Sequence, residues 1–120
     1  MEWSLEDVEK TSLLNPNTFF IPSQKERKKQ KSGDLVRLRF VLSHPSEDGP
    51  RAERMWVEIT EKKLFSQKYK GILTNQPIYI NSLHVGDKIE FQPKHIARII
   101  IPKGDPCWLD IGEKMALVSK

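Results

Sequence analysis

Strict alternation of apolar and polar residues begins in GDLVRLRFVL, at residues 33–42. From Val36 onward every second residue is apolar, and the residues between them include Arg37 and Arg39. ERMWVEIT, at 53–60, repeats this period of two. Successive side chains of a strand point to opposite faces of its sheet, so both stretches predict strands with one buried face.

Short apolar runs separated by turn-forming residues continue the pattern. TNQP and HVGD are typical turn sequences because proline, glycine, asparagine and aspartate favour tight changes of direction. Further strands are predicted at 64–73, 78–80, 89–91 and 96–101. Many short strands at this spacing predict an α+β fold, mainly antiparallel β, with a strongly curled sheet or small barrel.

Two Gly-Asp pairs precede predicted strands, at Gly33-Asp34 and at Gly86-Asp87. Each pair is followed by one or more alternating aliphatic residues and then a phenylalanine, Phe40 in the first stretch and Phe91 in the second. Glycine reaches a positive φ at low cost, and an aspartate side chain can hydrogen-bond nearby backbone. Both pairs therefore predict a tight turn that leads into a strand.

The first third of the chain has helix signals instead. Ser4 with Asp7 resembles a capping box and predicts a helix near 5–14, while Ser23 with Glu26 predicts a second helix over 24–31. We expect one or two N-terminal helices in a segment, 1–32, that packs on the sheet. The β domain core then spans 33–105, and 106–120 forms a tail.

The tryptophan in ERMWVEIT lies on the charged face of its predicted strand. Trp56 could form a ligand platform with Tyr69 and Tyr79, or it could be covered by the N-terminal segment and TFFI (18–21). A curled sheet shields part of both faces, and large aromatic side chains contribute heavily to cores. We therefore expect Trp56 to form a floor beneath the N-terminal segment. The candidate partner-binding residues are Trp56, Tyr69, Tyr79, Arg37 and Arg39.

The basic character of the chain comes from one segment, KERKKQK at 25–31. It holds five basic side chains and one acidic one, so it carries +4, the whole formal net charge; the rest of the chain holds 15 of each sign. Such a run can bind phosphates, yet it contains no aromatic residue to stack on bases, and a solvated helix is the alternative interpretation. The candidate nucleic-acid contacts are Lys25, Arg27, Lys28, Lys29 and Lys31.

Motifs of catalysis and metal binding are absent from the sequence. The histidines, His44, His84 and His95, have no zinc-like spacing with one another or with Cys107, the single cysteine. No phosphate-binding glycine loop or nucleophile elbow occurs. The sequence also has no secretory signal and no apolar stretch long enough to span a membrane. We therefore expect a cytoplasmic protein that is not an enzyme and uses no cofactor, metal or membrane.

Three stretches carry a resemblance to a known family: ERMWVEIT, YKGILTNQPIYI and VGDKIEFQPKHI. Together with TFFIPSQKERKKQKSGD they resemble a bacterial family of unknown function, sometimes called YegJ-like, over about residues 16–97. LTNQP departs from the family pattern, in which an acidic residue more usually precedes the asparagine. WLDIGEKMALVSK resembles the lead-in to a further small domain found in some members.

The resemblance implies no catalytic activity. Related domains occur among immunity proteins, which bind and neutralise a toxin. The sequence thus predicts a non-enzymatic module for protein–protein interaction, of immunity type by this resemblance. Nucleic-acid binding through 25–31 and the adjacent sheet face is the alternative.

Overall fold

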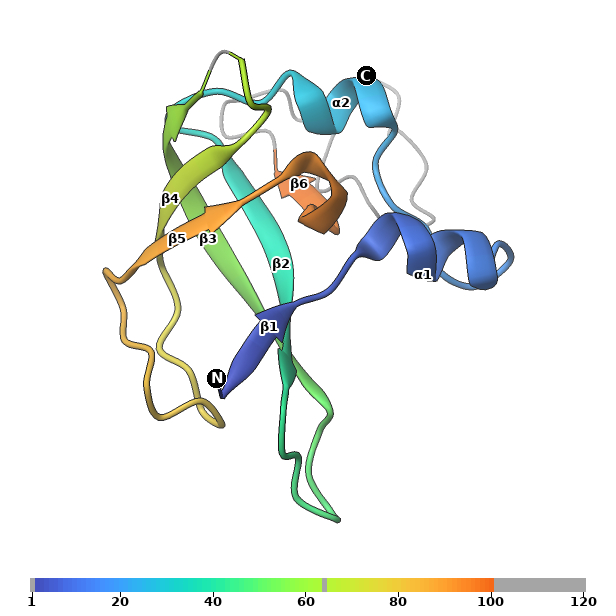
Figure 1. The fold of residues 1–120 in the computed structure, drawn as a ribbon, viewed down its shortest axis with the longest axis vertical. Coiled ribbons are helices and arrows are strands. Elements are labelled where there is room, and N and C mark those ends of the chain that lie inside the picture. The colour runs from blue at the N-terminus through green and yellow to red at the C-terminus, as the bar shows by residue number, and fades with distance from the viewer. Residues whose placement is uncertain (1, 64, 101–120) are drawn as a thin grey trace, which may run out of the picture.

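The computed structural model describes residues 2–63 and 65–100. A six-stranded antiparallel sheet is accompanied by two short helices near the N-terminus and one 3-10 turn (Figure 1). The elements in chain order are β1 (Trp3–Leu5), α1 (Val8–Leu14), α2 (Gln24–Lys28), β2 (Leu35–Leu42), β3 (Ala52–Lys62), β4 (Tyr69–Leu73), β5 (Lys88–Phe91), η1 (Pro93–His95) and β6 (Arg98–Ile100).

Strand β2 organises the sheet. Its strands run in the order β1-β2-β3-β4-β5, and β6 also pairs with β2. Strand β3 follows one side of β2 over most of its length, whereas β1 and β6 divide the other side between them. The ribbon curls into a half-barrel, as Figure 1 shows. The predicted α+β fold with a strongly curled antiparallel sheet is confirmed.

The core fills the concave side of this sheet. Val36, Leu38 and Phe40 of β2 are fully buried, and each alternates with a half-buried residue of the opposite face. Met55 lies opposite Leu38, and Val57 lies opposite Val36, so the period of two in both strands places the same side chains inside. Burial of these apolar side chains is the main source of stability.

The two Gly-Asp pairs make the same turn. Gly33 has φ +95° and Gly86 has φ +94°, the left-handed region that glycine enters most easily. Asp34 Oδ2 accepts a hydrogen bond from the Lys31 amide at 3.0 Å, and Asp87 Oδ2 accepts one from the His84 amide at 2.9 Å. The predicted turns are confirmed, although each aspartate bonds backwards, three residues earlier in the chain.

The N-terminal segment differs in detail from the prediction. Trp3–Leu5 forms a strand on β2, so Ser4 cannot cap a helix; Asp7 is the N-cap of α1 and accepts a hydrogen bond from the Lys10 amide. Ser23 caps α2 as predicted, but the helix ends at Lys28. Both N-terminal helices were predicted, although their bounds differ. Strand β1 was missed because three residues are too few to show a period.

Two predictions about the strands are wrong. Residues 78–80 form no strand, and Ile78 is exposed whereas Ile80 is buried. Strand β4 begins only at Tyr69, which leaves Phe65 outside the sheet and exposed, although it was expected to share a face with Tyr69 and Leu73. The 106–120 segment and Cys107 lie outside the described residues.

Trp56 is half-buried on the convex face of the sheet. The Arg37 guanidinium lies over the Trp56 ring, 5.6 Å from its centroid. The backbone amide of Trp56 donates to Asn75 Oδ1 at 2.5 Å. Among the described residues, no hydrogen bond or ring contact joins Trp56 to the N-terminal segment. That segment reaches the same face further along β2, where Arg39 lies over the Phe19 ring at 5.2 Å.

Candidate functional site

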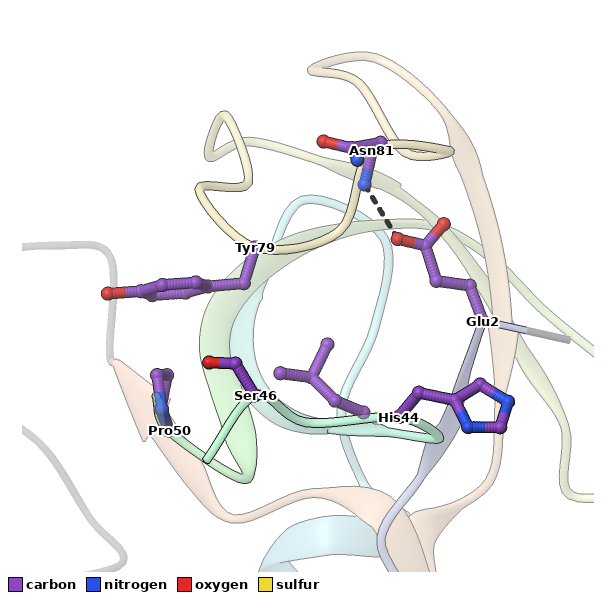
Figure 2. A pocket seen from close by; sticks show the side chains of 7 residues that line it. Glu2, His44, Ser46, Pro50, Tyr79 and Asn81 are labelled. Atoms are coloured by element: carbon purple, nitrogen blue, oxygen red, sulfur yellow. Dashed lines mark hydrogen bonds between the residues drawn. The ribbon is translucent and has the colours of Figure 1, made fainter. Parts of the chain in front are cut away.

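A hollow of about 320 Å³ lies where three separate segments meet, at the end of the sheet where β3 begins. Its lining comes from the N-terminus, from the β2–β3 connection and from the β4–β5 loop (residues 74–87). The lining residues are Glu2, Leu42, His44, Ser46, Pro50, Tyr79 and Asn81. In Figure 2 the Tyr79 ring lies on the same side as Pro50, and Glu2 and His44 lie on the other side.

The β4–β5 loop is held in place by two glutamates rather than by regular structure. Glu53 accepts hydrogen bonds from the amides of Ile78 and Tyr79 at 2.6 and 3.1 Å. Glu2 accepts them from the amides of Asn81 and Ser82 at 2.9 and 3.2 Å, the first of which is drawn in Figure 2. A charged acceptor makes stronger hydrogen bonds than a neutral one, so these four contacts between residues 78 and 82 fix the loop.

The electrostatics of Glu2 follow from the same contacts. Hydrogen bonds from Ser82 and then from Asn81 lower its pKa below the ordinary value of 4.5. Both donors stabilise the charged form of the carboxylate. A negative charge is therefore kept at one wall of the hollow.

The fixed loop presents apolar side chains to solvent. Ile78 is 76% exposed, Tyr79 49% and Val85 54%. We call Ile78, Tyr79 and Val85 the loop patch. A hydrogen bond from the Val85 amide to Gln76 Oε1, at 3.4 Å, links the two sides of the β4–β5 loop. The Tyr79 ring belongs both to this patch and to the wall of the hollow, so the two features form one continuous site.

His44 and Ser46 of the hollow have side chains suited to acid-base or nucleophilic chemistry. In the part of the chain that the structure describes, however, neither side chain hydrogen-bonds to Glu2 or to the other. A nucleophile requires a base within hydrogen-bond reach. Nor does any group of three or more His, Cys, Asp or Glu side chains among residues 2–63 and 65–100 have the placement to hold a metal ion.

Residues 3–104 match a family described as uncharacterized proteins conserved in bacteria, DUF2314. The chain belongs to this family. No curated protein and no solved structure matches it. Within the described part, no helix has the length and apolar character needed to cross a membrane.

The predicted partner-binding residues of this family member lie in separate places. Tyr69 is buried in the core, where its ring stacks on Phe91 and its hydroxyl donates to the Arg27 carbonyl at 2.7 Å. A partner cannot reach it, so its place among the candidates is corrected. Trp56 lies on the convex face of the sheet, and Tyr79 lies in the site described above.

The two predicted arginines also lie on that convex face, away from the hollow. Arg37 contacts the Trp56 ring, while Arg39 pairs with Glu6 at 3.4 Å and covers Phe19. The sequence analysis did not single out Ile78, which is exposed beside Tyr79. The Asn-Gln-Pro turn directly before Ile78 was the available signal that this residue lies in a loop.

The basic run does not act as one surface. Arg27 is 5% exposed, and its guanidinium donates to the carbonyls of Pro22 and Pro93 at 2.9 and 3.1 Å and to Glu9 at 2.5 Å. It is a structural residue, so its prediction as a nucleic-acid contact is wrong. Lys25, Lys28, Lys29 and Lys31 are exposed, and two of them form ion pairs: Lys29 with Glu26 at 3.1 Å and Lys31 with Asp34 at 4.0 Å.

Proposed function

We propose that this protein is a non-enzymatic binding module whose protein partner docks on the loop patch and the hollow beside it. The observation that carries the proposal is an exposed apolar patch on a loop whose backbone is fixed by Glu2 and Glu53. Single exposed apolar residues are ordinary on protein surfaces. Three on one fixed loop beside a hollow have the composition and setting of an interface core.

Fixing the loop before binding favours affinity. Association is opposed by the loss of loop and side-chain freedom, and a preorganised surface loses less of it. Tyrosine is one of the residue types that dominate binding energy, because a rigid ring buries a large area with few rotatable bonds. We take Tyr79 as the central anchor, since it is an exposed member of the loop patch and also lines the hollow.

The partner is expected to combine an apolar surface with a basic side chain. The Glu2 carboxylate supplies a negative wall, and the face of the Tyr79 ring attracts cations. A lysine or arginine of the partner that enters the hollow would meet both groups. The YegJ-like resemblance, with its relation to immunity proteins, supports a toxin as this partner.

Site-specific photocrosslinking in the native host tests the proposal. A photoreactive phenylalanine analogue replaces Ile78 in one variant and Leu13 of α1 in the control; both side chains are exposed, at 76% and 82%. We expect one discrete adduct from position 78, none from position 13, and loss of the adduct when Tyr79→Ala is added. Equal adducts from both positions contradict the proposal.

The partner that the crosslink identifies is then purified in its free form and titrated with this protein by calorimetry. We expect Tyr79→Ala to raise Kd about thirtyfold, because a central tyrosine contributes about 2 kcal/mol. Leu13→Ala should leave Kd unchanged. A Kd that is insensitive to Tyr79→Ala would mean that the partner docks on a different surface.

A further inference from the structure

A second hollow is lined by residues of α2, the β3–β4 connection and η1, at the other end of β3. It consists of two adjacent cavities of about 350 and 210 Å³ that share Lys28, Gln67 and Pro93 as lining residues. We call these cavities together the basic groove. Strand β3 thus has the loop patch near its first residue and the basic groove near its last.

Four lysines from three segments line the basic groove: Lys28, Lys62, Lys63 and Lys94. Among the described residues, a carboxylate pairs only with Lys63, whose amine is 3.5 Å from Glu90. The tertiary structure therefore concentrates positive charge that is separated by up to 66 positions in the sequence.

The acid that lines the basic groove is already engaged. Glu9 is bound by the buried Arg27 guanidinium, so its charge is neutralised within the protein. The amine of Lys62 donates to the Lys28 carbonyl at 2.5 Å and lies over the Tyr69 ring at 5.6 Å. These contacts hold one wall of the groove in place and leave a net positive lining.

An aromatic ring projects beside these lysines. Phe65 is 98% exposed and lines the larger cavity next to Gln67, whose φ of +54° turns the chain back toward β4. A phenylalanine in this state gains nothing from the core of the protein. Its ring is available to stack on a flat, apolar surface brought by a ligand.

We propose that the basic groove binds single-stranded nucleic acid, with phosphates on Lys28 and Lys94 and one base stacked on Phe65. A positive groove that follows the backbone together with an exposed aromatic ring is the usual arrangement for single strands. Bases in a duplex are already stacked on their neighbours, so Phe65 can select an unpaired one. An acidic peptide would use the lysines alone, whereas a single strand also stacks a base on the exposed Phe65 ring, so the observed combination favours the nucleic acid.

Fluorescence anisotropy with labelled oligonucleotides tests this proposal. The probes are a single strand of about 12 nucleotides, as DNA and as RNA, the matching duplex, and a glutamate-rich peptide of the same length. We expect the single strand to bind best and its log K to fall with log salt at a slope of about −1.4, as for the two phosphate contacts on Lys28 and Lys94.

Two kinds of variant separate the contributions. Lys28→Ala with Lys94→Ala should weaken binding and make the salt slope shallower by about 1.4, which corresponds to two lost phosphate contacts. Phe65→Ala should weaken binding about tenfold at an unchanged slope, because a stacking contact releases no counterions. Lys10→Ala and Leu13→Ala, at exposed positions of α1, are the matched controls.

All these side chains are exposed or half-exposed, so the variants should keep the wild-type circular dichroism spectrum. The proposal is overturned if no probe binds at about 50 mM salt. It is equally overturned if the peptide or the duplex binds as well as the single strand, or if the controls lose as much affinity as the groove variants. Photocrosslinking at position 78 probes the loop patch at the other end of β3. Failure of nucleic-acid binding can therefore be distinguished from failure of the proposed protein binding.

Discussion

Arg27→Met is the substitution that tests the fold most directly. The Arg27 side chain links α2 to α1 through Glu9, to η1 through the Pro93 carbonyl, and to its own turn through the Pro22 carbonyl. Its own carbonyl accepts the Tyr69 hydroxyl. Methionine has a similar unbranched stem but no donors, so it removes the three side-chain contacts and leaves the backbone contact in place.

The expected loss in the free energy of unfolding depends on which hydrogen bonds each acceptor of Arg27 keeps after the substitution. The Pro93 carbonyl still accepts the Ile96 amide at 3.1 Å, and the partly exposed Glu9 carboxylate can be rehydrated. Pro22 is buried, and its carbonyl loses its hydrogen bond from Arg27. One buried unpaired acceptor together with two weakened contacts gives a loss of about 3 kcal/mol in the free energy of unfolding.

Urea denaturation followed by circular dichroism measures this loss. At a slope of about 2 kcal/mol/M, the midpoint should fall by about 1.5 M. Lys29→Met in the same segment removes only an exposed pair with Glu26, so it should change stability by less than about 0.5 kcal/mol. Arg27→Lys keeps the charge with a single donor group and should lie between them. An equal, small effect of Arg27→Met and Lys29→Met would refute the structural role.

Two further stability predictions follow from the sheet and from η1. Burial lowers the pKa of His95 below 6.5, so the unfolded chain binds a proton at this imidazole more readily than the folded chain, and stability should fall as pH drops below about 6.5. This decline should be shallower in His95→Gln. Urea midpoints of the two proteins that run parallel from pH 7.5 to 5.5 would contradict the prediction. Gly71→Ala places a Cβ 2.5 Å from the Glu58 carbonyl oxygen and 2.6 Å from Val57 Cγ1, so the melting temperature should drop by roughly 10 °C, whereas Lys70→Ala on the exposed face should change it little.

The opposite ends of β3 carry different chemistry. The end near Ala52 meets the apolar loop patch and a carboxylate, and the end near Lys62 meets a groove lined by lysines. The eleven residues of β3 separate the two sites and fix the distance between them. A partner protein and a nucleic acid could therefore occupy this chain at the same time.

Local patterns were enough to predict most of the fold. Alternation in 33–42 and 53–60 identified β2 and β3 and their buried faces, because a strand with one dry side must place every second residue inside. The Gly-Asp pairs predicted two turns correctly, since positive φ is a property of the residue itself. Strand β1 escaped prediction because its three residues are too few to show a period.

The candidate sites depended on contacts that a sequence does not display. Ile78 and Ile80 follow the spacing of a strand, yet two amides bound to Glu53 hold that stretch as a loop and turn Ile78 outward. Within 25–31 the five basic residues look alike, and only packing against Glu9, Pro22 and Pro93 selects Arg27 for burial.

The sequence by itself determined which residues of β2 and β3 face the core, because apolar periodicity is a local consequence of strand geometry and of the free energy of burial. Tertiary structure alone decided which exposed side chains meet. The loop patch needs Glu2 and Glu53, and the basic groove needs lysines from three segments. Neither set shares a local period, because each forms only when the curled sheet brings distant turns to the same end.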